Sequence, residues 1–416
     1  MQSEQGYTTG DASLMRELNA SLVLNLMWQR GSISRVDIAK ETKLSRPTVS
    51  SVVADLLDAG WVRESGHGES SGGRRPILLE FNYEARYIVG VVVSTDSLAV
   101  TIHNLRAEVV ARSEDALSIK TKPKALAERV AERGRRTAGQ GGIDWDRVIG
   151  IGVALPSPYD YVSGKVTSVE MMPGWRGVSF KAMLEETLGK PVEVDNNANL
   201  GAIAEKWWGA GQGADNLVYV MFGVGIGSGL IIGGEIYRGR AGSAGEIGHL
   251  TIDMNGPRCR CGKKGCLEAV ADTRAILKEA SAALVSGEET SLREIRAGRE
   301  LKIEDVGMAA EAGDPLSRRI LQRAGRYLGL ALADLVNLLN PDLIVLDAPG
   351  TGAVFLESVR EALHDYALPV ACQTVEVIPA DLGPNAVAIG AATMVLQGLL
   401  QRPSLGAEPV APGTPS

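Results

Sequence analysis

Short apolar runs alternate with amphipathic stretches along most of the chain. The runs are rich in Val and Ile and end in turn residues, as buried strands do. They are YIVGVVVS (87–94), VIGIGVAL (148–155), NLVYVMFGVG (216–225) and DLIVLDAP (342–349). Helical periodicity lies between them, as at 178–189 and 317–339. This alternation predicts an α/β architecture with a glycine-rich hairpin at 217–238, and we find no short internal repeat.

A different pattern precedes residue 86. Residues 13–30 predict one helix, and SRVDIAKETKL (34–44) predicts a second. A third begins after Ser45, a good N-cap, and tolerates Pro47 in its first turn. Its apolar positions recur at helical spacing and form one stripe that we expect to be buried: Val49, Val52, Val53, Leu56 and Leu57. Two strand-like runs, WVRES and PILLEF, then flank a polar turn, so the order predicts a winged helix-turn-helix over 13–82.

The exposed side of this third helix is small and polar, which fits a DNA major groove. Arg46 lies at the helix start, where recognition helices usually touch base edges. Arg74 and Arg75 lie in the basic tip of the wing, which suits phosphate or minor-groove contact. The residues predicted to contact DNA are Ser45, Arg46, Pro47, Thr48, Ser51, Arg74 and Arg75. Because one module reads a short half-site, we expect a homodimer or tetramer on a double-stranded DNA operator.

A generic three-helix domain for protein contact is the alternative. Residues 1–80 hold nine Lys and Arg against ten Asp and Glu, which gives that alternative some support. The order of the elements, the presence of a wing and the positions of the three arginines favour DNA binding.

Composition narrows the class of protein. The 416 residues are 45% apolar and 22% charged, as in a globular protein of two or three domains. The net charge of −7 excludes a polybasic nucleic-acid coat but allows a small DNA-reading module. We find no apolar run of the ~18 residues that a membrane span needs and no signal core in the polar first residues, so we expect a cytoplasmic protein with no membrane partner. Residues 1–12 and the Pro- and Gly-rich 402–416 are expected to be disordered.

Three of the four cysteines lie within eight residues of one another. Cys259, Cys261 and Cys266 follow His249, and three thiolates with one imidazole are a set that structural zinc favours. The two glycines of the loop allow it to curl around an ion, and a closed four-ligand site leaves no open position for catalysis. Four basic neighbours are expected to lower the pKa of the thiols: Arg258, Arg260, Lys263 and Lys264. Three buried or redox-active cysteines are the alternative.

Four polar stretches carry a resemblance to a known family. They are GIGVALPSP (150–158), VDNNANLGAIAEKWWG (194–209), FGVGIGSGLIIGGEIYRG (222–239) and AGEIGHL (244–250). With the Glu-x-Gly-His and C-x-C-G-x-x-G-C-x-E motifs, they resemble the ROK family (repressors, open reading frames, kinases) from about residue 13 to 400. The winged-helix start is similar to that of the family's transcriptional regulators, such as the xylose repressors. The resemblance implies an actin-like (ribonuclease H-like) body over 86–401, with two lobes divided near 200–215 and a sugar in the cleft.

The same resemblance exposes a departure at the phosphate loop of ROK kinases. Those kinases carry Asp-x-Gly-Gly-Thr after the first strand, where this chain has GVVVSTDSLAV. Val92 stands at the Asp position, and Ser94 and Thr95 stand at the glycines. Side chains therefore replace the bare backbone that approaches phosphate, and the carboxylate of Asp96 adds repulsion.

A second departure removes the catalytic base. The kinase run Glu-Asn-Asp-Ala-Asn, whose Asp takes the proton of the sugar hydroxyl, is DNNAN (195–199) here. Asn197 is an amide and cannot act as a general base, although it can still hydrogen-bond a sugar. LDAPG (346–350) replaces a Gly-Gly pair near the nucleotide base, and Val224 replaces the usual Thr of the hairpin. We therefore expect neither ATP binding nor enzymatic activity.

The positions that bind sugar survive this comparison. The resemblance assigns sugar binding to five residues: Asn196, Asn197, Glu246, His249 and Glu268. Carboxylates and amides suit the task because each can take two hydroxyls. His249 would bond a sugar hydroxyl through one ring nitrogen and hold zinc through the other. Asn199 and Glu205 are expected to be helix-start and surface groups. A polar loop and a solvated carboxylate that form a vestigial, empty pocket are the alternative.

Together these expectations predict a DNA-binding regulator of carbohydrate metabolism, most often a repressor. A monosaccharide or sugar phosphate changes its operator affinity, and it can do so only by binding two states with different affinity. The helix at 317–339 is expected to aid dimerisation. Two alternatives stay open: a ROK sugar kinase with an appended DNA module, and a ligand-independent regulator controlled by a protein partner.

Overall fold

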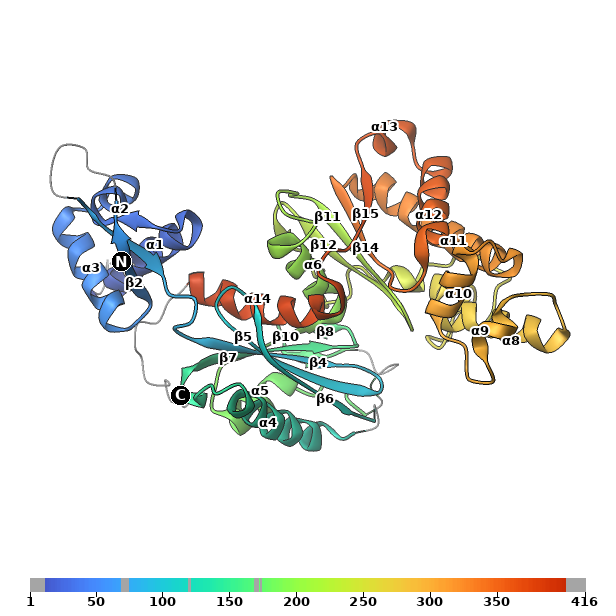
Figure 1. Cartoon of the computed structure of the whole chain (residues 1–416), viewed down its shortest axis with the longest axis horizontal. Coiled ribbons are helices and arrows are strands. Elements are labelled where there is room, and N and C mark those ends of the chain that lie inside the picture. The colour runs from blue at the N-terminus through green and yellow to red at the C-terminus, as the bar shows by residue number, and fades with distance from the viewer. Residues whose placement is uncertain (1–11, 69–74, 119–120, 168–171, 173, 402–416) are drawn as a thin grey trace, which may run out of the picture.

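The computed structural model describes residues 12–68, 75–118, 121–167, 172 and 174–401 (Figure 1). The predictions for residues 1–11, for 402–416 and for Arg74 fall outside these residues, whereas Ala12, which was expected to be disordered, begins a helix. Three parts follow one another along the chain. A small N-terminal module is followed by two lobes, and each lobe is built on its own five-stranded sheet.

The N-terminal module is a winged helix-turn-helix, as predicted. Its elements are α1 (Ala12–Arg30), β1 (Ile33–Ser34), α2 (Arg35–Thr42), α3 (Arg46–Asp58), β2 (Val62–His67) and β3 (Ile77–Phe81). The three strands pair antiparallel in the order β1-β3-β2, and β2 and β3 form the wing. The helices enclose one core, to which the buried stripe of α3 contributes.

Local chemistry explains where α3 begins and which side it buries. The Ser45 hydroxyl accepts the backbone N–H of Thr48 at 3.2 Å, which caps the helix. Pro47 lies in the first turn, where no intrahelical donor is lost. Val49, Val52, Val53 and Leu56 are buried as predicted, whereas Leu57 is half-buried at the edge of the same core. The opposite side of α3 stays available for contact with another molecule.

The first lobe is a mixed sheet with helices on both faces. Its strands are β4 (Tyr87–Val93), β5 (Ser97–His103), β6 (Val109–Ala116), β7 (Val148–Leu155) and β10 (Val192–Asn196), in the order β10-β7-β4-β5-β6. Its smaller elements are η1 (Trp145–Arg147), β8 (Tyr159–Asp160) and β9 (Lys165–Val166). One face is covered by α4 (Pro123–Gln140) and α5 (Phe180–Leu188), and the other by α14 (Ala386–Gln401) (Figure 1).

The second lobe repeats this plan with a larger set of helices. Its strands are β11 (Leu217–Phe222), β12 (Ile226–Ile232), β13 (Glu235–Ile236), β14 (Leu343–Asp347) and β15 (Glu376–Pro379), in the order β13-β12-β11-β14-β15. Its helical elements are η2 (Ile247–His249), α7 (Leu267–Ala271), α8 (Thr273–Ser286), α9 (Leu292–Arg296), α10 (Ile303–Glu311), α11 (Pro315–Leu339), α12 (Gly352–Tyr366) and α13 (Pro369–Cys372). The elements α6 (Asn197–Trp208) and η3 (Gly383–Asn385) lie where the chain passes between the lobes.

The two sheets share one topology. In each, the first three strands form an antiparallel meander, the fourth pairs parallel with the first, and the fifth pairs parallel with the fourth. No repeat is visible in the sequence, so the duplication exists at the level of strand order alone. This two-lobed arrangement is the actin-like body that the resemblance implied.

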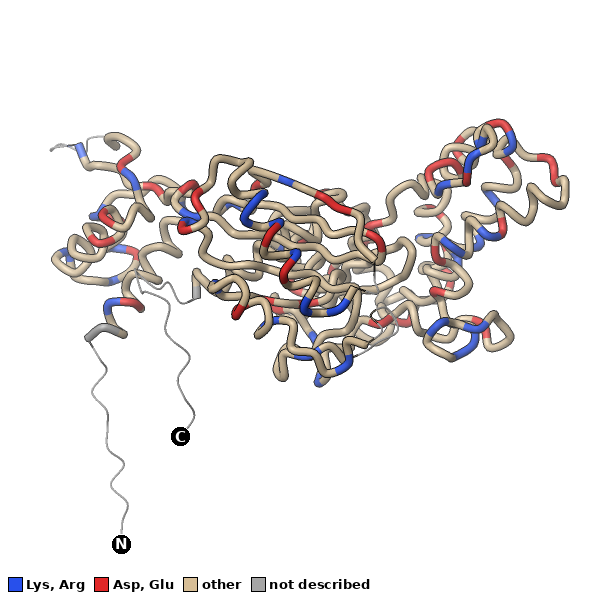
Figure 2. Tube along the Cα trace, turned by 90° about the horizontal axis from the view of Figure 1, so that it is seen from below, with Lys and Arg blue, Asp and Glu red and all other residues tan. Residues whose placement is uncertain are grey.

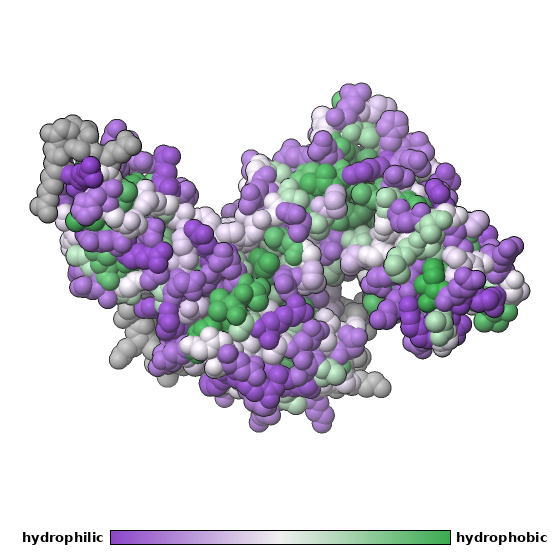
Figure 3. Space-filling view, viewed as in Figure 1, coloured by the Kyte–Doolittle hydropathy of each residue, from purple (hydrophilic) through white to green (hydrophobic). Residues whose placement is uncertain are grey.

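Helix α14 is apolar because it is an internal helix. Residues Gly383–Leu400 are long and apolar enough to cross a membrane by length and composition, a feature that the search for uninterrupted apolar runs missed. More than half of that window is buried, and α14 packs on β4, β7 and α6. A Cβ at Gly390 would lie 1.8 Å from the backbone oxygen of Leu200, so the two helices touch at backbone distance. A band of hydrophobic residues follows α14 across the face drawn in Figure 3.

Candidate functional site

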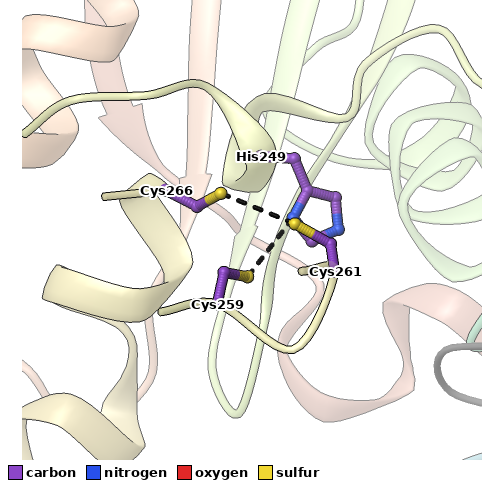
Figure 4. A group of neighbouring side chains, drawn as sticks. All are labelled: His249, Cys259, Cys261 and Cys266. Carbon is purple, nitrogen blue, oxygen red and sulfur yellow. Dashed lines mark hydrogen bonds between the residues drawn. The ribbon is translucent and has the colours of Figure 1, made fainter. Parts of the chain in front are cut away.

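The cluster of His249 with Cys259, Cys261 and Cys266 is the one group of this kind among the described residues that fits a metal ion. Figure 4 shows the four side chains converging from η2, the cysteine loop and the start of α7. Their ligand atoms all lie within 4.8 Å of one another. The Cys261 and Cys266 sulfurs are 3.6 Å apart, and the Cys259 sulfur is 3.8 Å from His249 Nδ1.

These distances fit a tetrahedral metal site. A Zn–S distance of about 2.3 Å places two sulfurs of a tetrahedron roughly 3.8 Å apart. The loop keeps its shape through backbone bridges that join Thr251 to Cys266 and Arg258 to Lys264. Gly265 has a positive φ, and a Cβ there would lie 1.5 Å from the Asp253 oxygen, so this turn needs glycine. The chain therefore holds four metal donors together without a disulfide among them.

The expected effect of basic neighbours on the thiols is wrong. Burial raises the pKa of Cys259, and it raises the pKa of Cys266 to about 12. Arg260 is paired with Glu268 at 2.6 Å, and the other three basic residues of the loop are exposed. Coordination by a cation acts in the opposite direction, because a metal binds the thiolate form.

Two of the predicted sugar ligands lie beside this cluster. His249 turns Nδ1 toward the Cys259 sulfur and presents Nε2 to Glu246, whose Oε2 is 3.9 Å away. The two ring nitrogens therefore face different groups, one a thiol and the other a carboxylate. The side chains of His249 and Glu246 are 24% and 36% exposed, so both are within reach of a ligand from solvent.

Glu268, the third predicted ligand of this group, is almost fully buried. Its Oε1 is 4.0 Å from the Cys259 sulfur, and its Oε2 accepts a hydrogen bond from Arg260 at 2.6 Å. Arg274 lies 3.6 Å from the same carboxylate. The sequence did not indicate this partnership, because nothing in the spacing of Arg260 and Glu268 distinguishes it from an exposed pair.

The predicted asparagines lie at the start of α6. The Asn196 side chain caps α6, since its Oδ1 accepts the Asn199 N–H at 2.7 Å. Asn197 Oδ1 is buried, and it has no hydrogen-bond partner among the described residues. The start of α6 packs against β12, whose Ser228 bonds the Gly245 oxygen immediately before Glu246. Both the start of α6 and the segment just before Glu246 therefore contact β12.

A buried ion pair next to the asparagines was not predicted. Asp195, at the end of β10 in the first lobe, is fully buried and meets Arg238, which follows β13 in the second lobe, at 2.7 Å. Asn199 donates to the other oxygen of Asp195 at 2.8 Å. The Arg238 guanidinium lies over the Tyr161 ring, 4.2 Å from its centroid. The pair therefore joins the two lobes at the place where the asparagines lie.

The position of Glu205 differs from the prediction. The residue was expected at the surface, but it is fully buried in α6. Its carboxylate accepts the backbone N–H groups of Ala210, Asp381 and Leu382 at 2.8–3.1 Å. Asn199 is at the start of α6 as expected, although it is buried too. Glu205 holds backbone in place and Asn199 bonds the Asp195 carboxylate, so neither is open to a ligand.

The DNA-facing residues are exposed on the N-terminal module. Arg46, Pro47 and Ser51 are exposed on α3, Thr48 is half-buried, and Arg75 is exposed at the base of the wing. Ser45 is engaged in capping, and its hydroxyl also bonds the Thr48 hydroxyl at 2.8 Å. Acidic and basic residues are interspersed over the module and the lobes (Figure 2). DNA contact must therefore come from a few placed residues rather than from a broad positive surface.

Comparisons with known proteins agree with the resemblance drawn from the motifs. The ROK family model matches residues 88–398, and a MarR family model matches residues 17–75. The chain is 32% identical over 394 residues to the xylose repressor of Bacillus subtilis (strain 168), and the match covers 94% of this chain and 98% of that protein.

Solved structures of a regulator and of a kinase of this family differ in how much of this chain they cover. The structure of a ROK family transcriptional regulator, a homolog of the E. coli MLC protein, aligns with a TM-score of 0.80 at 30% identity over 93% of this chain and 98% of that chain. A ROK family glucokinase from Streptomyces griseus, in complex with glucose and AMPPNP, aligns with a TM-score of 0.66 at 26% identity over 74% and 98%. The regulator accounts for nearly the whole chain, and the kinase accounts for about three quarters of it.

Proposed function

Because this chain belongs to the ROK family, we propose that it is a DNA-binding transcriptional repressor whose operator affinity is changed by a sugar bound in its two-lobed body. The observation that carries this proposal is the joining of two parts in one chain. A winged helix with an exposed recognition face precedes a body in which Glu246 and His249 face one another at the edge of a metal cluster. The control of carbohydrate genes follows from the xylose repressor at 32% identity.

We propose that the body has no kinase activity and does not use ATP. Support comes from Asn197, which stands where kinases of the family have their base and cannot accept a proton. Val92, Ser94 and Thr95 fill the phosphate loop, so the backbone cannot approach a nucleotide phosphate closely. A ROK sugar kinase with an appended DNA module is the competing function, and ATP-dependent phosphorylation of a hexose would establish it.

We propose structural zinc for the His and Cys cluster. The donor set of one imidazole and three thiols, held at tetrahedral spacing, is the support for this assignment. His249, Cys259, Cys261 and Cys266 would hold the ion with no position left open, so its contribution is to fix the loop and the start of α7. Through His249, the ion also fixes the ring nitrogen that faces the sugar site.

For the effector, we propose a monosaccharide or sugar phosphate that contacts Glu246, His249 and Glu268. The amides of Asn196 and Asn197 at the start of α6 are the further ligands that we propose, with Asn196 limited by its role as a cap. Xylose, glucose, N-acetylglucosamine and their phosphates all fit this chemistry. Control by a protein partner in place of a sugar is the alternative, and an operator complex that no sugar shifts would favour it.

We further propose that the protein acts as a homodimer or tetramer in the cytoplasm. One module reads only a half-site, so a second copy supplies the other half of a symmetric operator. The decisive experiment is fluorescence anisotropy on DNA from upstream of the protein's own gene and of neighbouring sugar genes, with a panel of monosaccharides and sugar phosphates titrated into the complex. Specific binding that one sugar shifts supports the proposal, and the absence of specific binding contradicts it.

Arg46→Ala should weaken operator binding by roughly 10-fold or more, because a base contact is worth about 1–3 kcal/mol. Sugar affinity should stay unchanged, since Arg46 lies in the DNA module. Anisotropy on the operator and calorimetry with the sugar measure the two affinities. Arg326→Ala is the matched control, because Arg326 is an exposed arginine on α11 in the second lobe. Equal operator affinity of Arg46→Ala and the wild type would remove α3 from the proposed interface.

Glu246→Ala should abolish the sugar response and leave operator binding intact. The carboxylate is the partly exposed acceptor facing His249, and its loss removes up to two charge-assisted hydrogen bonds to sugar hydroxyls. We expect at least a 10-fold weaker sugar affinity by calorimetry. Glu235→Ala, at an exposed glutamate of β13, is the control. If Glu246→Ala still responds normally to the inducing sugar, the pocket is elsewhere.

A further inference from the structure

Helix α6 reaches from the proposed sugar site to the DNA-binding module. Asn196 and Asn197 lie at its first turn, and Trp207 and Trp208 are its last two residues. Twelve helical residues span about 18 Å. The same rigid element therefore carries pocket residues at one end and aromatic side chains at the other.

The two tryptophans of α6 meet a tryptophan of the DNA module. Trp28 on α1 lies 5.4 Å from Trp207 and 5.8 Å from Trp208, measured between ring centroids. The interplanar angles of 54° and 79° are the tilted and edge-on geometries that aromatic pairs prefer. This triad, Trp28, Trp207 and Trp208, is a specific contact between the module and the body.

Helix α6 is fixed to α14, so the two move together. The Glu205 carboxylate holds the N–H groups of Asp381 and Leu382 just before α14, and Trp208 Nε1 donates to the Thr393 hydroxyl at 2.8 Å. The Leu200 backbone is in direct contact with Gly390. Polar bonds at two places and a backbone contact between them leave little freedom for one helix to slide on the other.

The far end of α14 enters the core of the DNA module. Leu396 and Leu400 are buried in the same cluster as Val23, Met27 and Val53 of the module. Asn25 on α1 donates to the Leu400 oxygen at 2.7 Å. Figure 1 shows α14 extending across the first lobe to the module. The module is therefore attached to the body through α14 and the triad.

The triad has an unsatisfied group. Trp28 Nε1 is buried and has no acceptor among the described residues. A buried donor without a partner is unfavourable, so a small rotation of the module that supplies an acceptor recovers free energy. An orientation of the module that offers Nε1 an acceptor would therefore break no existing hydrogen bond of this group.

We propose that Trp28, Trp207 and Trp208 are positioning residues that couple occupancy of the sugar site to the orientation of the DNA module. The inference rests on the proposed function and adds the path by which sugar binding affects the DNA module. A ligand that binds at the first turn of α6 favours one placement of the α6–α14 pair. Through the triad and the end of α14, this placement sets the position of α1, and therefore the position of the recognition helix packed against α1.

The test compares Trp28→Leu with Trp28→Phe and with Trp145→Leu. Leucine keeps an apolar side chain in the contact but removes both ring pairs, and phenylalanine restores an aromatic ring. Trp145 is the matched control, because it is also a tryptophan with a buried, unpartnered Nε1, but it packs against α4 in the first lobe. For each variant we would measure operator affinity with and without saturating D-xylose, and D-xylose affinity alone.

We expect D-xylose to change operator affinity by about 10-fold or more in the wild type and in Trp145→Leu. In Trp28→Leu the change should fall below about 3-fold, while each separate affinity stays within about 3-fold of the wild type. Trp28→Phe should recover most of the response. A purely structural role would instead alter operator affinity or thermal stability and leave the ratio unchanged. A full response in Trp28→Leu overturns the coupling.

Should D-xylose fail to shift the wild type, the operator duplex itself is the probe, because coupling is reciprocal. Hydrogen exchange of residues 197–203 should then slow by about 3-fold or more when the wild type binds operator, and should not change in Trp28→Leu. An unchanged exchange rate in the wild type overturns the coupling but leaves a DNA-binding protein. The absence of specific DNA binding overturns the proposed function, and the coupling with it.

Discussion

Cys266→Ser is expected to remove zinc from the protein and to abolish its sugar response. The three remaining donors cannot close a tetrahedral site, and a serine hydroxyl is a poor zinc ligand. Cys266 is fully buried and precedes α7, so loss of the ion also frees the helix that carries Glu268. Because metal binding contributes directly to folding in such sites, the Tm of the body should fall by roughly 5–10 °C. Emission spectroscopy of dialysed protein measures the zinc, and differential scanning calorimetry measures the Tm.

The fourth cysteine provides the control for this substitution. Cys372 is half-buried near β15, outside the cluster, so Cys372→Ser should keep about one zinc per chain and a normal sugar response. Operator binding should survive in both variants, because the cysteine cluster lies in the second lobe, outside the core that the DNA module shares with α14. A Cys266→Ser protein that retains a full equivalent of zinc would show that the cluster is not the zinc site.

Arg238→Ala should be the most destabilising single substitution at the lobe interface. It leaves the Asp195 carboxylate buried without a counter-charge, and breaking a buried pair in this way costs about 3–5 kcal/mol. The Asn199 side chain and the Asn196 backbone N–H continue to donate to Asp195, so two hydrogen bonds of the site remain. The expected result is a Tm about 5–10 °C below that of the wild type. Calorimetry also shows whether the two lobes then unfold in separate transitions.

Arg240→Ala is the matched control for Arg238→Ala. Arg240 is an exposed arginine two residues along the same loop, and its removal should change stability by no more than about 0.5 kcal/mol. Adding Asp195→Asn to Arg238→Ala should restore more than half of the lost stability, since an amide carries no charge to bury. A Tm within a degree of the wild type in Arg238→Ala alone would mean that the pair contributes nothing net.

The sequence predicted most of the elements and little of their arrangement. Each of the four Val- and Ile-rich runs is a strand, and the helices expected at 178–189 and 317–339 are α5 and α11. Period-2 and period-3.6 patterns are local, so they can be seen in one sequence. The shared strand order of the two lobes depends on pairings between distant strands, such as β11 with β14, which local patterns do not encode.

The difference between local patterns and distant pairings also decides which parts of the site were predicted and which were not. The four metal donors lie close together in the sequence, and their residue types limit the chemistry. Asp195 and Arg238 are distant in sequence, so their pairing depends on how the lobes pack. Glu205 was misjudged because a glutamate on a helix is usually exposed, and only the tertiary structure brings three backbone N–H groups to it.

The position of α14 in the chain has a consequence for biosynthesis. The strands β4 and β7 leave the ribosome early, but the helix that covers one of their faces and completes the core of the DNA module is made some 230 residues later. Synthesis proceeds at about 5–20 residues per second, so that apolar face stays exposed for roughly 10 s or more before α14 is made. During this interval the nascent chain is a natural client for a chaperone. A premature stop before α14 would yield a recognition helix without its proper support, and such a fragment is expected to be degraded rather than to compete for operators.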